Sequence, residues 1–168
     1  MVPTPYVDGF ISACKNNGIP ENNDYNGVSQ EGAGLVHSTI KNGSRQSGAV
    51  AFLKPILNRP NLTAITNAQV CKILLKDKIA VGIEYKKGSE LIKVYANKEV
   101  IVSAGAFQSP QLLMLSGIGD FSELKKHGIE CLHELKGVGK NLQDHLFYPI
   151  CAQSKTQEGI NHYISPLS

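Results

Sequence analysis

The sequence contains no tryptophan, and its few cysteines form no recognisable site. The four cysteines, Cys14, Cys71, Cys131 and Cys151, lie far apart without a CxxC pair, which excludes the usual zinc and redox spacings. Cys71 and Cys151 lie in apolar runs, where we expect buried free thiols.

Long apolar runs and runs of like charge are also missing. No segment is long enough to span a bilayer, and residues 1–6 lack the basic and hydrophobic parts of a signal peptide. The formal net charge is +3 and the lysines are scattered, so we expect neither nucleic acid nor a membrane surface as a partner. We therefore expect a cytoplasmic protein.

A dinucleotide-binding fingerprint is absent from the chain as well. GxGxxG must lie between a strand and a helix, so that phosphates meet backbone N–H groups at the helix N-terminus. In Gly137-Val138-Gly139, Leu142 stands where the third glycine belongs, and Gly117-Ile118-Gly119 follows a helical pattern instead of preceding one. Neither segment is expected to bind phosphate.

The histidines form no metal or catalytic group. His37, His133 and His162 have no spaced partner for metal or acid–base chemistry, and His127 falls in the last turn of a predicted helix, where a cation suits the helix dipole. His145 is the candidate general base, but we interpret residues 141–145 as structural, with Asn141 and Asp144 bonding nearby backbone. No Ser-His-Asp or paired-carboxylate motif is present, so we predict no catalytic and no metal-binding residue.

What the sequence does have is the composition of a folded domain. Its 168 residues suffice for one core or for parts of two domains, and 42% hydrophobic with 18% charged residues is typical of soluble globular proteins. Periodicity and turn residues predict a mixed α/β (α+β) fold. We expect helices over 5–17, 47–57 and 121–127, and strands over 36–40, 62–66, 69–75, 79–85, 91–96, 129–132 and 145–152. The turn at 41–44 separates two elements, and strands 69–75, 79–85 and 91–96 read as an antiparallel meander.

The most informative stretch runs from Glu99 to Gly119. Glu99–Ser103 is a β-branched run without alternation, which predicts a strand buried on both faces. Ala104-Gly105-Ala106 then reduces the side chains to hydrogen or methyl groups. In open α/β sheets, such a turn at the carboxyl end of a strand is where cofactors bind.

The helix after this turn has its own signals. Ser109 and Pro110 predict an N-cap and a first-turn proline, followed by an apolar helix over 111–115. Gly117 and Gly119 are expected to end it.

This stretch and several others resemble the glucose–methanol–choline (GMC) family of FAD-dependent oxidoreductases, most closely its choline-dehydrogenase-like branch. The resemblance covers nearly the whole chain and rests on Gly105-Ala106, Ser109-Pro110, Leu112-Leu113, Ser116 to Gly119, Gly137 to His145, Asp24 to Gly27, Asn42 to Ser47 and Arg59 to Thr63.

The resemblance implies a division of the chain. Residues 59–145 would form part of an FAD-binding domain, in which a parallel-sheet portion carries the three-stranded meander. Residues 1–58 and 146–168 would be pieces of a substrate domain. The implied activity is oxidation of the CH–OH group of a small alcohol to a carbonyl, with hydride transfer to flavin.

The resemblance also implies cofactor-binding residues. Ser103, Ala104, Gly105 and Ala106 would lie against the adenosine and pyrophosphate of FAD, and the backbone of Val70 would bond the adenine. From the residues alone, close packing of strand on helix explains the small side chains equally, and a core position explains Val70. The cofactor interpretation requires that Ala104–Ala106 lie neither in open solvent nor sealed beneath a side chain.

The family's fingerprint and catalytic histidine belong to blocks that none of these residues match. We therefore expect that the chain alone neither holds FAD tightly nor oxidises alcohol. Two alternatives are a piece of a split enzyme completed by partner chains and a non-functional truncated product. A small domain reused for a function unrelated to redox chemistry is a third.

Overall fold

The computed structural model describes residues 5–150, and the chain divides into two compact units. Of the described residues, one unit comprises 5–62 with 149–150, and the other comprises 63–148. The domain boundaries expected from the sequence, after residues 58 and 145, stay a prediction, because compactness does not show to which domain a unit belongs.

The first unit begins with helix α1 (Pro5–Asn16), as the sequence predicted. Asp8 in the first turn and Lys15 in the last turn both complement the helix dipole. Gly18 follows in the left-handed region, with φ +81°, where the helix has ended.

A short hairpin follows, made of β1 (Ile40–Lys41) and β2 (Ser44–Arg45). Asn42 and Gly43 form its turn with φ values of 51° and 73°, the left-handed backbone that a tight hairpin turn requires. The predicted turn is confirmed. The predicted strand over 36–40 is wrong except at Ile40, because no segment within residues 5–150 pairs with residues 36–39.

The helix expected over 47–57 is present in a broken form. It consists of a π-helical turn, η1 (Ala49–Leu53), and a 3-10 turn, η2 (Lys54–Ile56). Ser47 Oγ accepts a hydrogen bond of 3.3 Å from the Val50 N–H at its start. Pro55 has no N–H to give to an i−4 carbonyl, so a regular α-helical ladder cannot continue through it.

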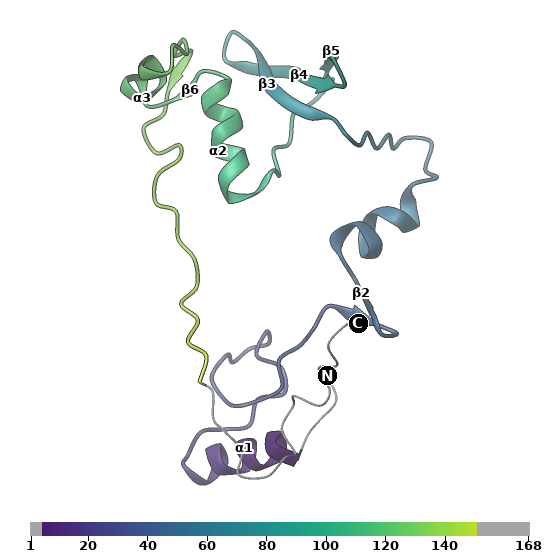
Figure 1. The fold of residues 1–168 in the computed structure, drawn as a ribbon, viewed down its shortest axis with the longest axis vertical. Helices are drawn as coiled ribbons and strands as arrows, with labels where there is room; N and C mark the ends of the chain where they lie inside the picture. Colours follow the sequence, from purple (N-terminus) through teal and green to yellow (C-terminus); the bar gives the residue numbers. More distant parts are fainter. Residues whose placement is uncertain (1–4, 151–168) are drawn as a thin grey trace, which may run out of the picture. The chain divides into compact units, whose positions relative to one another are not determined.

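The second unit is built around the predicted meander. Strands β3 (Gln69–Lys76), β4 (Ile79–Lys87) and β5 (Glu90–Tyr95) pair antiparallel in the order β3-β4-β5 (Figure 1). Asp77 and Lys78 connect the first two strands with φ values of 49° and 66°. The strand predicted over 62–66 is wrong, since those residues pair with no strand in the described part of the chain.

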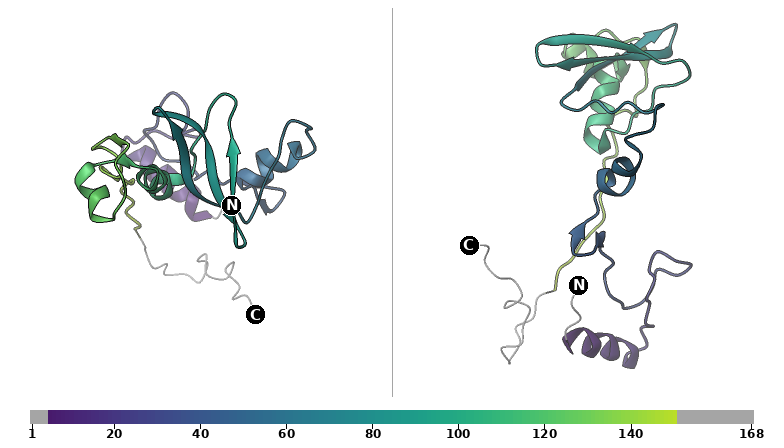
Figure 2. Two further views of the ribbon diagram at one scale, coloured as in Figure 1. Left: turned by 90° about the horizontal axis from the view of Figure 1, so that it is seen from above. Right: turned by 90° about the vertical axis from the view of Figure 1, so that its right-hand side faces the viewer.

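Helix α2 (Gly105–Leu115) packs against β3, and the ribbon views show it beside the meander (Figures 1 and 2). After it, β6 (Ile118–Gly119) pairs in parallel with β7 (His133–Glu134), and helix α3 (Phe121–Lys126) lies between them in sequence. Strand pairing thus begins at His133, so the strand predicted over 129–132 is wrong.

The last predicted strand, over 145–152, is also not formed within the described residues. Residues 145–150 pair with no strand, and residues 151 and 152 lie outside the described part.

The buried residues of the second unit come from the meander and both helices. Its buried side chains are Ile73, Tyr85, Leu112, Ser116 and Leu124. Ser116 is 0% exposed, and its hydroxyl connects the end of α2 to β3. The core of this unit therefore holds α2 in a fixed position on the sheet.

Candidate functional site

Two of the predicted cofactor residues meet in a pocket between β3 and the helix packed on it. This pocket, the β3–α2 pocket, encloses about 310 Å³. Val70 and Ala104 both line it, from segments more than thirty residues apart in sequence. Its other lining residues are Ala68, Gln69, Gln108, Gln111, Leu112 and Leu115.

The turn of small residues leads directly into α2. Gly105 has φ +89°, and a Cβ added there would meet no atom within 4 Å. Its glycine therefore provides the left-handed conformation, and the space above the backbone is open. Ser103, Ala104, Gly105 and Ala106 are all exposed.

The predicted start of the helix is wrong by one turn. α2 begins at Gly105, with Ala104 as its N-cap, so Ser109 and Pro110 lie inside the helix. Ser109 Oγ accepts a hydrogen bond of 3.1 Å from the Ala104 N–H, so the serine holds the turn from within the helix instead of capping its own segment. No side chain caps the first turn of α2, which leaves its N–H groups available.

The covered strand expected before this turn is not formed. Residues 99–103 pair with no strand among the described residues, and Ile101 is 77% exposed. A β-branched run becomes a buried strand only where neighbouring strands supply backbone partners on both sides. Ala104–Ala106 are exposed, and Ala104 and Ala106 each line a pocket, so their role in binding a cofactor stays a prediction.

A second, larger pocket lies on another side of the same helix. It encloses about 770 Å³ between α2 and residues 137–143, and Ala106 and Phe107 line it. We call it the α2–loop pocket. Val70 and Ala106 line different pockets, so the structure does not gather all the predicted cofactor residues at one point.

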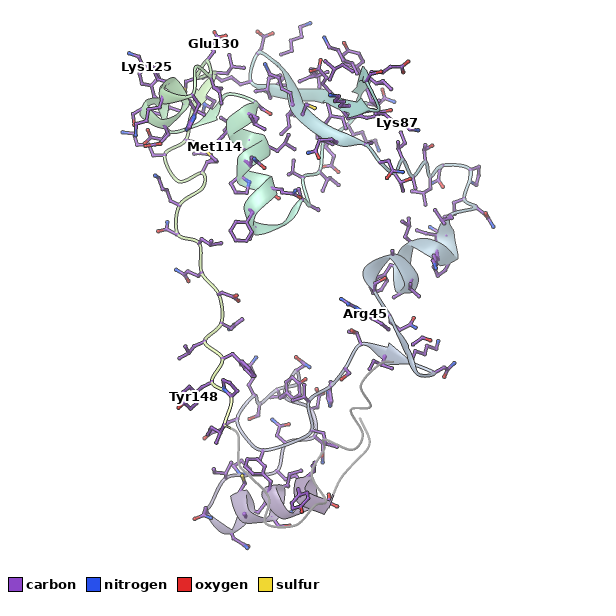
Figure 3. The ribbon with its side chains drawn as sticks, in the orientation of Figure 1. Arg45, Lys87, Met114, Lys125, Glu130 and Tyr148 are labelled. Carbon is purple, nitrogen blue, oxygen red and sulfur yellow. The ribbon has the colours of Figure 1, made fainter. Side chains whose placement is uncertain are left out.

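The loop of the second pocket overlaps residues 141–145, for which the sequence predicts a structural role. Gly139 and Asn141 have φ values of 76° and 57°, and a Cβ at Gly139 would lie 3.4 Å from Met114 Cε. Figure 3 labels Met114 on α2. Glycine and asparagine adopt positive φ readily, so Gly139 and Asn141 are the sequence signal for this tight loop. That signal does not show that the loop faces Ala106.

The carboxylate that starts α3 is held by hydrogen bonds. Asp120 Oδ1 accepts from the Ser122 hydroxyl and from the Ser122 and Glu123 N–H groups. The Ser122 hydroxyl first, and then the backbone bonds, lower the pKa of Asp120 below its ordinary value. These bonds are the helix cap, and they account for the shift without a catalytic role.

No histidine in the described residues has the surroundings of a general base with a partner carboxylate. His37 Nε2 lies 3.0 Å from the Asn23 carbonyl oxygen, and its ring lies beside Tyr25 at 4.9 Å between centroids. His145 follows Asp144, whose Oδ1 accepts from the His145 N–H at 2.8 Å, as expected of a structural residue. His162 lies outside the described residues.

Residues 5–150 also contain no cluster of three or more potential metal ligands. Cys14, Cys71 and Cys131 are free and half-buried, so the expected full burial of Cys71 is wrong, and Cys151 lies outside the described part. Within that part, no helix has the length and apolar character to cross a membrane.

Comparison with known proteins decides the family. Residues 2–147 match the family model described as GMC oxidoreductase. This chain belongs to the GMC oxidoreductase family. The match spans both pockets and confirms the resemblance drawn from the motifs.

GMC relatives are similar over most of this chain. It is 46% identical over 160 residues to an alcohol dehydrogenase [acceptor] from Pseudomonas putida, which covers 93% of this chain and 29% of that protein. It is 50% identical over 142 residues to the mitochondrial choline dehydrogenase of Homo sapiens, which covers 84% of this chain and 24% of that protein.

The fold agrees with a solved GMC-like structure. An FAD-dependent oxidoreductase from Chaetomium thermophilum superimposes with a TM-score of 0.76 and 32% identity, covering 84% of this chain and 25% of that one. The chain thus spans 24% to 29% of the length of these relatives.

Proposed function

We propose that this chain supplies part of the FAD site of an oxidoreductase that converts the CH–OH group of an alcohol to a carbonyl. The family match over residues 2–147 is the observation that carries the proposal. The similar proteins named alcohol and choline dehydrogenase support the substrate class, and the FAD-dependent structural relative supports the cofactor. FAD, when bound, supplies the acceptor for the hydride.

The residues present are suited to hold the nucleotide part of that cofactor. Ala104 and Gly105 keep side-chain atoms out of the way of an approaching ligand, and the N–H groups of α2's first turn carry no side-chain cap. Uncapped N–H groups at a helix start attract phosphate. Val70 forms part of the opposite wall of the β3–α2 pocket.

The Ala104 N–H has a different role in this proposal. It already donates to Ser109 Oγ, so it holds the turn in place and is not assigned to the ligand. Ala104 contributes its small side chain, and Gly105 contributes an accessible backbone.

A chimera tests the proposal. Residues 2–147 replace the corresponding segment of the Pseudomonas putida relative, and flavin per polypeptide is measured after desalting. We expect the chimera to retain FAD, Ala104→Leu to lower the flavin content by filling the pocket, and Ala13→Leu, at an exposed position on α1, to leave it unchanged. A folded chimera without flavin, or equal flavin in both variants, would contradict the assignment.

We also propose that further polypeptide covers the turn. Ile101 and Phe107 are 77% and 74% exposed, and residues 99–103 lack strand partners among the described residues. The chain alone should therefore lose FAD on desalting and leave alcohol unoxidised; flavin absorbance that stays with the isolated chain would refute this.

The covering polypeptide can belong to the same chain or to a separate one. Co-expression with the remaining segments of the Pseudomonas putida relative as separate chains tests the second arrangement. Co-purification of the pieces with flavin would support a split enzyme, and failure to associate would argue against it.

A further inference from the structure

Ser116, directly after the last residue of α2, makes a contact that its position in the motif does not explain. Its side chain is completely buried. The hydroxyl donates to the Leu112 carbonyl oxygen at 2.6 Å and accepts from the Ile73 N–H at 2.8 Å. It therefore connects a helix end to a strand 43 residues away.

The bond to Ile73 replaces a strand partner. β4 is the only described neighbour of β3, and the Ile73 N–H is bonded to Ser116. Without the hydroxyl, this buried N–H would have no acceptor, which is costly in a dry interior.

Ile73 lies in the central paired segment of β3, residues 72–74. The pairing of β3 with β4 shifts register between Val70 and Lys72 and again between Leu74 and Leu75. A strand with a bulge on each side of one short regular segment can bend at both. The hydrogen bond to Ser116 holds Ile73 in place. Ile73 is therefore the fixed part of β3 closest to Val70, which lines one wall of the β3–α2 pocket.

The other partner of Ser116 belongs to the opposite wall. Leu112 lines the β3–α2 pocket together with Ala104. Ser116 donates to Leu112 and accepts from Ile73, which belongs to β3 but does not itself line the pocket. At the far end of α2, Ser109 holds the Ala104 N–H. Ser116 thus connects the C-terminal end of α2 to β3, and Ser109 holds the N-cap residue Ala104 against the helix itself.

We propose that Ser116 is a positioning residue, whose hydroxyl sets the separation of β3 and α2 and so the width of the pocket between Val70 and Ala104. Its relevance to FAD rests on the function proposed above, whereas its effect on the pocket does not. Ser116 itself is fully buried and contacts no ligand in this account.

The test uses the 168-residue chain with its alanine, valine and leucine methyl groups labelled for NMR. We compare Ser116→Ala with Leu124→Val, which removes a methylene from the core at a side chain that is 2% exposed and does not line this pocket. Nuclear Overhauser contacts among the Val70, Ala104 and Leu112 methyl groups report the pocket. Shifts of the same signals in millimolar FAD report the ligand.

We expect Ser116→Ala to weaken the methyl contacts across the pocket and to lower FAD affinity relative to wild type. Leu124→Val should keep the wild-type contacts and affinity although it also lowers stability. Methyl contacts in Ser116→Ala that match those of Leu124→Val would overturn the positioning role.

Two further measurements keep the proposal testable if Ser116→Ala does not fold. Ser116→Cys preserves the shape with a weaker hydrogen-bonding group, so its contacts should fall between wild type and alanine. In the wild-type chain the Ile73 amide should exchange slowly with solvent, and fast exchange would refute the bond. Lost contacts in Ser116→Ala, with no response of wild-type methyl groups to FAD, would support positioning and refute the cofactor site.

Discussion

At the scale of single residues, the backbone conformation at the tip of the β3–β4 hairpin is the clearest case of local strain. Asp77 and Lys78 have φ values of 49° and 66°, a left-handed pair that suits the twist of a two-residue hairpin. Lysine has a Cβ that disfavours this region, and glycine does not.

Lys78→Gly should therefore stabilise the second unit by about 0.5 kcal/mol, because the relief of strain slightly exceeds the entropy cost of glycine. The urea midpoint should rise with an unchanged m-value. Lys87→Gly, the same change at the end of β4, should lower the midpoint. A lower midpoint for Lys78→Gly would contradict the argument from strain.

Asp120 gives a pH-dependent prediction at the same scale. Hydrogen bonds lower its pKa in the folded protein, so its contribution to stability is complete above the ordinary aspartate pKa of about 4 and is lost as pH falls through the lowered value. Asn also caps helices but does not titrate in this range.

When the pH falls from neutral to strongly acidic, the stability of Asp120→Asn should thus decrease less than that of wild type. Melting temperatures measured across that range for both proteins check this. If the melting temperatures of the two proteins decreased equally on acidification, the carboxylate of Asp120 would not be stabilised by folding.

At the scale of elements, the meander depends on a glycine that has no special backbone angle. A Cβ at Gly82 would overlap the Val94 carbonyl oxygen and lie 3.0 Å from Tyr95 Cα. β4 and β5 pair at this point, so the backbone would have to shift to admit a methyl group.

Gly82→Ala should destabilise the second unit by about 1–3 kcal/mol through this overpacking. Gly137→Ala is the control, because a Cβ there meets no atom within 4 Å and its φ is not positive. Chemical denaturation gives the midpoints of both variants. Equal midpoints would show that β4 and β5 accommodate the added methyl group without loss of stability.

The elements also show what the sequence could reveal. The meander and α1 follow from periodicity and turn residues that are local, and both are confirmed. The strand over 99–103 and the helix start at Ser109 depended on contacts that are not local. Ile101 has no strand beside it among the described residues, and Ser109 bonds backward to Ala104.

At the scale of the whole molecule, the two compact units differ in how much they bury. Among the described residues, Ala33 is the only buried hydrophobic side chain of the first unit, whereas the second unit buries four. Burial of apolar surface is the main source of local stability, so the units should open with different free energies.

Amide hydrogen exchange of the chain should therefore show strong protection in β3, β4, α2 and α3, and weak protection in β1, β2 and η1. The readout is the exchange rate of each segment under native conditions. Uniform protection across both units would contradict the difference in burial.

The site itself was only partly predictable at this scale. Val70 and Ala104 were assigned by resemblance, and the structure brings them into one pocket. The role of Ser116 was hidden, because its partner Ile73 lies 43 residues away and no local pattern connects them. Motifs identified the family, but they did not show which of their residues face one another.

We propose that this chain supplies part of an alcohol-oxidising flavin site. In the chimera with the Pseudomonas putida relative, the direct measurement is the visible absorbance of bound flavin on addition of alcohol without oxygen. We predict that alcohols that bleach the flavin of the parent also bleach that of the chimera. A chimera that folds and holds FAD, yet is reduced by none of those alcohols, would contradict the account.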